Sequence, residues 1–259
     1  MAMDQTLAHR SRAVMSPQEW AARVDLAACY RIVAHYGWDD LITTHISVRV
    51  PGEPHHFLIN PFGLMFEEMT ASSLIKIDVD GNKVDMSSPY DVNPAGFVIH
   101  SAIHEGVTDA HAVVHLHSRD GVAVSAMADG LLPLDQTSIG VCANLAYHEF
   151  EGPALRMEEQ ERLRQDLGDC HSMVLRNHGT LTVGRTVTEA FMRMYALEQS
   201  CTRQVRAMAG GKLHRPPAEV IADMATTNNV RSDILENYYR LSWAALLRML
   251  DRRNPGYAD

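Results

Sequence analysis

The sequence is poor in cysteine and in concentrated positive charge. Its cysteines are Cys29, Cys142, Cys170 and Cys201, and no two form a Cys-x-x-Cys pair. Neither a cysteine-based zinc knuckle nor a dithiol redox motif is therefore expected. With 23 Lys and Arg against 32 Asp and Glu, the formal net charge is −9. Because phosphate contacts need clustered Lys and Arg, this balance argues against a nucleic-acid-binding protein.

Long apolar runs are also missing. No stretch approaches the roughly 18 consecutive apolar residues that predict a membrane-spanning helix. Residues 1–12 are polar and lack the apolar segment of a secretory signal peptide. Hydrophobic residues make up 46% and charged residues 21% of the 259 residues, a balance typical of a folded globular protein. We therefore expect a cytoplasmic protein that binds a small molecule and neither nucleic acid nor a membrane.

Hydrophobic periodicity predicts an α/β domain with a helical C-terminal extension. Ser16 and Pro17 offer an N-cap and a first-turn proline for a helix that ends near Gly37. Strands are predicted at 43–50, 57–59, 74–79, 112–117, 173–176 and 180–183, and further helices at 96–105, 120–127, 157–167, 187–208 and 232–250. Turns between the first three strands favour antiparallel pairing. The expected organisation is a flexible segment at 1–15, one domain at 16–208 and the extension at 209–259.

Histidine is abundant, with 14 residues, and two of them alternate in the apolar segment Val113-Val114-His115-Leu116-His117. Alternate strand residues point to the same face with Cα atoms about 6.5–7 Å apart, so His115 and His117 can converge on one ion. Catalytic metal sites usually have three protein ligands and an open position. The best third candidate is His178, which lies in a turn between two apolar strands.

Other polar residues give weaker signals. His100 and His104 share a face of a predicted helix. Ser101 stands where a zinc protease would carry glutamate after its first histidine, which argues against a metalloprotease. His100 is a candidate for facing the substrate, and Tyr147 with His148 is a candidate acid/base pair.

Several motifs, in this order, resemble the class II aldolase/adducin family, the group around fuculose-phosphate and ribulose-phosphate aldolases. The resemblance runs from about Trp20 to Ala207 and is carried by Thr44–Arg49, Ile59–Leu64, His100 through His117, and Arg176–Gly179. It implies a central, mainly antiparallel sheet with helices on both faces. It also implies a homo-oligomer, a cyclic tetramer with active sites at subunit interfaces.

The resemblance further implies a metal site. The family's metal ligands correspond to His115, His117 and His178. The metal is a divalent cation, most often zinc, with manganese, cobalt and iron as alternatives.

The sequence departs from the sugar-phosphate aldolases at the substrate. The position of their acid/base glutamate, counted back from His115, holds Gly96. Thr44 and His45 replace a Gly-Asn pair that holds phosphate, and Pro61 offers no N–H to an anion. We therefore expect a substrate without phosphate. The pattern resembles the adducin-like branch of the family.

The leading hypothesis is a metal-dependent carbon–carbon lyase. It would act on a small unphosphorylated hydroxy or keto acid through a metal-stabilised enolate, by aldol cleavage or decarboxylation. Proton transfer would fall to His45, His100, Tyr147 or His148. The expected substrate-binding residues are His45, Asn60, Gly63 and Gly96. Two alternatives stay open: a mononuclear iron oxygenase, although such enzymes usually add a carboxylate ligand, and a non-catalytic scaffold like the adducin head domain.

Overall fold

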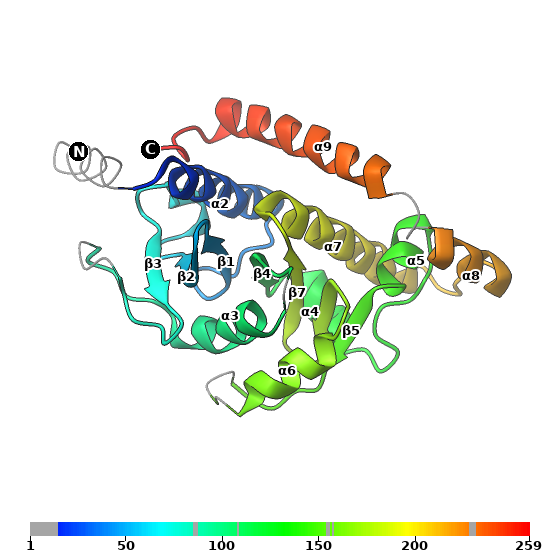
Figure 1. The fold of residues 1–259 in the computed structure, drawn as a ribbon. Coiled ribbons are helices and arrows are strands. Elements are labelled where there is room, and N and C mark those ends of the chain that lie inside the picture. The colour runs from blue at the N-terminus through cyan, green and yellow to red at the C-terminus, as the bar shows by residue number, and fades with distance from the viewer. Residues whose placement is uncertain (1–14, 85–87, 108, 154–155, 157, 228–231) are drawn as a thin grey trace.

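The computed structural model describes residues 15–259 except 85–87, 108, 154–155, 157 and 228–231 (Figure 1). The strands are β1 His45–Val50, β2 Glu53–Ile59, β3 Ile75–Asp78, β4 Ala112–Leu116, β5 Leu145–His148, β6 Ser172–Leu175 and β7 Gly179–Gly184. The helices are α2 Pro17–Tyr36, α3 Pro94–Gly106, α4 Arg119–Ser125, α5 Gln136–Cys142, α6 Glu159–Leu167, α7 Val187–Ala209, α8 Ala218–Thr227 and α9 Ser232–Arg253, with a short 3₁₀ turn at Phe66–Glu68. The segment predicted to be flexible, 1–15, lies outside the described residues except for Met15.

The strands form one sheet in the order β3-β2-β1-β4-β7-β6-β5. Every neighbouring pair is antiparallel except β5 and β6, which run parallel. The predicted mainly antiparallel sheet is therefore confirmed. In the central pair, His45 on β1 lies opposite His115 on β4.

Helices cover both faces of the sheet, as predicted. Alternation on the central strands sends Ile46 and Val114 into a core with α2 and α7, and sends Val113 into a second core with α3 and α6. In Figure 1, α2 and α7 lie side by side, α9 lies against them, and α3 and α6 lie on the opposite side of the sheet. The side of the sheet that carries Val113 also carries His115, because both are odd-numbered residues of β4.

The first helix begins and ends where the sequence predicts. The Ser16 hydroxyl accepts a hydrogen bond from the Glu19 N–H at 3.0 Å, and Pro17 occupies the first turn. Gly37 ends the helix in the left-handed conformation, with φ of 66°, where glycine has no Cβ to strain. Packing of this helix against β1 places the Tyr30 hydroxyl on the main chain of Ile46.

Three elements lie where the sequence analysis predicted none: α5, β5 and α8. The four residues of β5 are too few to show a clear alternation, and the strand is held by parallel pairing to β6, which comes 24 residues or more later in the chain. The seven residues of α5 are fixed by a capping box, in which Asp135 accepts from the Ser138 N–H. Among the described residues, no helix combines the length and apolar character that crossing a membrane requires.

Candidate functional site

Three histidine rings converge at one end of the sheet. His115 lies near the end of β4, His117 directly follows that strand, and His178 lies in the turn between β6 and β7. Their ring centroids are 4.9 Å apart for His115 and His117, and 4.8 Å apart for each of the other two pairs. One nitrogen from each ring lies within 4.8 Å of the others. The prediction that these three residues come together is therefore met by the geometry.

The turn that carries His178 is held at both sides. Asn177 adopts a left-handed φ of 55°, and its N–H donates to the Ser125 carbonyl at 3.1 Å. A Cβ on Gly179 would lie 2.3 Å from the carbonyl oxygen of Leu116, so only glycine lets this turn approach β4. The close approach brings His178 to His115 and His117.

Hydrogen bonds at the outer nitrogens determine which nitrogen is free in two of these rings, those of His115 and His117. Nδ1 of His115 lies 3.0 Å from the Thr180 carbonyl oxygen, and Nδ1 of His117 lies 3.3 Å from Oδ2 of Asp40. Both partners only accept, so each Nδ1 carries the proton and each Nε2 has a lone pair. These two Nε2 atoms face each other at 3.1 Å.

Two facing lone pairs repel unless a cation lies between them. Nitrogen ligands on one tetrahedral zinc ion, each at about 2.0–2.1 Å, are about 3.3 Å apart, which is close to the 3.1 Å observed here. The three imidazoles therefore fit a divalent metal in separation and donor type, and His115 and His117 also fit it in tautomer.

Burial keeps these rings neutral. Desolvation lowers the pKa of His115 well below its ordinary value, and the neighbouring histidines lower it further. Desolvation and the charge of His117 lower the pKa of His178 to about 4. Desolvation also lowers the pKa of His117, although Asp40 opposes that shift. Near neutral pH, the lone pairs that a metal needs are thus available.

A second buried group of histidines lies beside the triad. The ring of His45 is 5.1 Å from that of His115, and Nδ1 of His45 lies 2.9 Å from Nε2 of His100. His45 and His100, predicted separately as substrate-binding and catalytic residues, are therefore in direct contact. A Cβ on Gly96 would lie 2.6 Å from Cδ2 of His45, so the third predicted residue is in contact with the same ring.

Sequence reasoning assigned no role to two members of this group. The hydroxyl of Ser47 lies 2.5 Å from Nδ1 of His100 and 2.7 Å from Nε2 of His104. A signal for each was present, because Ser47 alternates with His45 on one strand and His104 follows His100 by four residues on one helix. What the sequence could not show is that β1 and α3 pack together.

The buried carboxyl group of Glu198, which the sequence analysis did not single out, supports the chain segments that carry the triad. Glu198 on α7 accepts hydrogen bonds from the hydroxyls of Ser118 and Thr180, the latter at 2.6 Å. Ser118 follows His117, and the carbonyl of Thr180 binds His115. Desolvation raises the pKa of Glu198 to about 7. One carboxyl group thus fixes both chain segments next to His115 and His117.

The remaining predicted substrate residues do not contact the triad. The side chain of Asn60 is buried and its Oδ1 lies 2.8 Å from the Tyr30 hydroxyl. Gly63 is exposed in the loop after β2, with a positive φ of 115°. In the structure, Asn60 serves the packing of α2 on the sheet, and a substrate role for either residue stays a prediction.

Tyr147 and His148 do not form a pair, because successive strand residues point to opposite faces. The Tyr147 hydroxyl accepts from the Leu131 N–H at 3.1 Å. Nδ1 of His148 lies 2.7 Å from Oδ2 of Asp166, and its Nε2 lies 3.4 Å from Oε1 of Glu159. The predicted acid/base pair is therefore not formed, and a catalytic role of either residue would be independent of the other.

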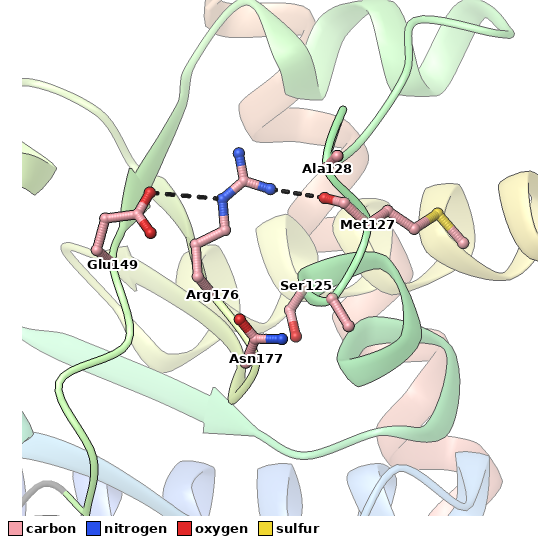
Figure 2. Close-up of a pocket in the computed structure, with 7 residues that line it drawn as sticks. Ser125, Met127, Ala128, Glu149, Arg176 and Asn177 are labelled. Atoms are coloured by element: carbon pink, nitrogen blue, oxygen red, sulfur yellow. Dashed lines mark hydrogen bonds and ion pairs between the residues drawn. The ribbon is translucent and has the colours of Figure 1, made fainter.

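A surface pocket of about 270 Å³ adjoins the turn that carries His178. Figure 2 shows Arg176 between the main chain of Met127 and the side chain of Glu149, at 2.8 Å and 3.9 Å. The guanidinium also lies 4.4 Å from the ring centre of Tyr147. The full lining is Ser125, Ala126, Met127, Ala128, Glu149, Arg176 and Asn177. A fixed cation therefore stands two residues before a candidate metal ligand.

The sequence and the fold of this chain are similar to those of several known proteins. The model of the Class II Aldolase and Adducin N-terminal domain matches residues 24–205. A Caulobacter vibrioides protein, whose name assigns it only provisionally to the class 2 aldolases, is 53% identical over 248 residues, 95% of each chain. Alpha-adducin of Rattus norvegicus is 44% identical over 189 residues, which are 72% of this chain and 26% of that protein. The solved L-fuculose 1-phosphate aldolase from Glaciozyma antarctica PI12 is similar with a TM-score of 0.77 and 28% identity, over 92% of each chain.

Proposed function

The chain belongs to the class II aldolase and adducin family, as its motifs predicted, and on that basis we propose that it is a metal-dependent carbon–carbon lyase. The observation that carries the proposal is the arrangement of His115, His117 and His178. Two of these rings keep their Nδ1 protons on fixed acceptors and direct their Nε2 lone pairs at each other. Without a cation between them, these two lone pairs repel each other, so the arrangement is favourable only with a metal bound.

The three histidines would hold the metal, which is zinc by family resemblance. When bound, a divalent cation supplies Lewis-acid stabilisation of the negative charge that develops on a substrate oxygen as a carbon–carbon bond breaks. Thr180 and Asp40 fix the orientation of His115 and His117, and Glu198 holds the segments on which Thr180 and Ser118 lie. This support preorganises the site before substrate arrives.

The substrate is proposed to be a small unphosphorylated hydroxy or keto acid. Pro61 has no N–H to donate to a phosphate, and Gly96 has no carboxylate for the proton transfer that family aldolases need. Arg176 supports an acidic substrate, because a guanidinium beside the His178 turn can pair with a carboxylate. His45 fills the space beside Gly96 and His100 contacts His45, and these two residues are the candidates for proton transfer.

The proposal is tested by screening the purified protein, loaded with zinc, manganese or cobalt, for cleavage or decarboxylation of unphosphorylated hydroxy and keto acids. We expect turnover that is lost in His115→Ala and kept in His55→Ala, whose side chain is exposed on β2. Turnover that survives in His115→Ala would contradict the proposal. The same screen separates aldol cleavage, which releases an aldehyde or ketone, from decarboxylation, which releases carbon dioxide.

A second candidate is a non-catalytic scaffold, which the similarity to alpha-adducin favours. Elemental analysis distinguishes the lyase from the scaffold. Protein purified without metal would favour the scaffold, and retained metal would favour the lyase. The iron oxygenase alternative gains no observation of its own, since the described group contains three histidines and no carboxylate. Oxygen consumption with ferrous iron is its test.

The assembly is proposed to be a homotetramer, again by family resemblance, with active sites between subunits. Light scattering coupled to size-exclusion chromatography tests this directly. A mass of four times 28.8 kDa is expected, and a monomer at micromolar concentration would contradict it.

A further inference from the structure

A chain of buried hydrogen bonds leads from the candidate metal site to a main-chain carbonyl. Nδ1 of His45 lies 2.9 Å from Nε2 of His100, and Nδ1 of His100 lies 2.5 Å from Oγ of Ser47. Ser47 Oγ lies 2.7 Å from Nε2 of His104, whose Nδ1 lies 2.8 Å from the carbonyl oxygen of Ala110. The four side chains are buried, and none belongs to the metal triad.

The carbonyl at one end determines the direction of the last two bonds. A carbonyl oxygen only accepts, so Nδ1 of His104 carries a proton and donates it to Ala110. Desolvation lowers the pKa of His104 to about 3, so the ring is neutral near pH 7 and its Nε2 has a lone pair. That lone pair must accept the single proton of the Ser47 hydroxyl. Without that donation, the lone pair of His104 and those of the Ser47 oxygen would face each other in the buried interior, which is unfavourable.

The direction then passes along the rest of the chain. With its proton given to His104, Ser47 can only accept, so Nδ1 of His100 donates to it. Burial and the neighbouring histidines keep His100 neutral by lowering its pKa well below the ordinary value. Nε2 of His100 therefore accepts the Nδ1 proton of His45. His45 is buried and no carboxylate is among its described partners, so its ring is neutral and keeps a lone pair on Nε2.

The free nitrogen of His45 is placed where a substrate group would need it. Its Nε2 lies on the ring edge that packs against Gly96, where a Cβ would come within 3.1 Å of it. The ring lies 5.1 Å from that of His115. Among the described residues, none forms a hydrogen bond with this atom. A side chain at position 96 would occupy the space that His45 now fills.

We propose that Ser47, His100 and His104 are positioning residues that hold His45 as the Nδ1–H tautomer, so that its Nε2 accepts a hydrogen bond from a substrate hydroxyl group beside the metal triad. The inference rests on the proposed function for the presence of substrate. The tautomer of His45 does not depend on that function, because the chain of hydrogen bonds sets it in the protein without substrate. An acceptor at this place selects hydroxy acids over the corresponding acids that lack the hydroxyl group.

The tautomer is tested by ¹⁵N NMR of zinc-loaded protein with labelled histidine rings, assigned through single-histidine variants. We expect a protonated Nδ1 and an unprotonated Nε2 for His45, His100 and His104. In Ser47→Ala the link is broken, and His45 should become a mixture of tautomers. Ser47→Thr, which keeps the hydroxyl, should restore the single tautomer. Ser101→Ala is the matched control, because Ser101 is also buried but its hydroxyl bonds Gln160.

The acceptor role is tested by adding glycolate or acetate to the same sample. Glycolate should move the Nε2 resonance of His45 in wild type, and the movement should be lost in Ser47→Ala, while acetate should leave that resonance in place. An Nε2-protonated His45 in wild type would contradict the proposed tautomer. A single Nδ1–H tautomer of His45 in Ser47→Ala would show that Ser47 does not hold it. Movement of the triad resonances alone would overturn the role of His45. Failure of glycolate to move any ring resonance would instead contradict the proposed function.

Discussion

The ring of His45 fills the space above Gly96, where a Cβ would lie 2.6 Å from Cδ2 of that ring. This position is the one at which family aldolases carry their acid/base glutamate, according to the spacing of the sequence motifs. The absence of a side chain at position 96 on α3 and the histidine at position 45 on β1 are therefore sterically coupled. A glutamate at position 96 and a histidine at position 45 could not both be accommodated without movement.

The first prediction concerns Gly96→Ala. Alanine in a helix is ordinarily more stable than glycine by about 0.5–1 kcal/mol. Here the added methyl group should displace His45 and lower stability, because overpacking costs about 1–3 kcal/mol. The midpoint of urea unfolding, measured at fixed protein concentration, should fall.

A double-mutant cycle makes that prediction specific. In a His45→Ala background the clash is absent, and Gly96→Ala should then raise the unfolding midpoint. An equal effect of Gly96→Ala in both backgrounds would show that the two residues do not share this space.

The second prediction concerns Asp40, which accepts the Nδ1 proton of His117 at 3.3 Å. Asp40→Asn should weaken zinc binding by about tenfold, because loss of a partner that orients a histidine ligand typically costs 10–100-fold in affinity. Competition with a chromogenic chelator measures the affinity. Asp39→Asn is the matched control and should bind zinc as wild type does; equal affinities in all three proteins would remove Asp40 from the site.

The third prediction follows from Glu198, whose pKa is raised to about 7 by burial. Between pH 4.5 and 7 the unfolded chain has lost this proton while the folded chain keeps it. The free energy of unfolding should therefore fall as the pH rises through that range, by on the order of 3 kcal/mol, and stay level above it. Denaturant titrations at a series of pH values measure the slope.

Glu198→Gln removes this titration and should flatten the slope. Glu189→Gln on the same helix is the contrast: burial raises the pKa of Glu189, but Arg193 and Arg185 together bring it below its ordinary value. Its removal should lower stability above pH 4.5 instead. An unchanged slope in Glu198→Gln would show that another group titrates.

The fourth prediction has the opposite sign and concerns His104, whose pKa is lowered to about 3. As the pH falls below 6.5, His104 takes up a proton in the unfolded chain, whereas the buried ring of the folded protein stays neutral until about pH 3. The free energy of unfolding should fall by up to about 1.4 kcal/mol per pH unit for this group until the pH approaches 3. His104→Asn should reduce the slope by one proton, and a slope equal to that of wild type would contradict the assignment.

Much of the framework could be predicted from the sequence because its signals are local. Ser16 and Gly37 bound α2 as their cap chemistry requires, and alternation in the 112–117 segment puts His115 and His117 on one face. His178 was predicted only through its pairing with those two residues and through family resemblance. The packing of Gly179 against Leu116 explains why the turn arrives there.

The rest of the site depends on contacts between distant segments. Ser47 meets His100 and His104 across separations of 53 and 57 residues, and Glu198 meets Ser118 across 80. No periodicity within β1, α3 or α7 contains that information. The pairing of Tyr147 with His148 was inferred from adjacency in sequence, although adjacency on a strand separates side chains to opposite faces.

The most direct test of the account is the zinc content of the purified protein. The protein is treated with a chelator, reloaded with zinc, freed of excess metal and measured by inductively coupled plasma mass spectrometry. One zinc ion per chain is expected in wild type and in His55→Ala, and background zinc in His115→Ala and His178→Ala. Wild-type protein without zinc, or equal zinc in all four proteins, would contradict the claim that these three imidazoles hold one cation.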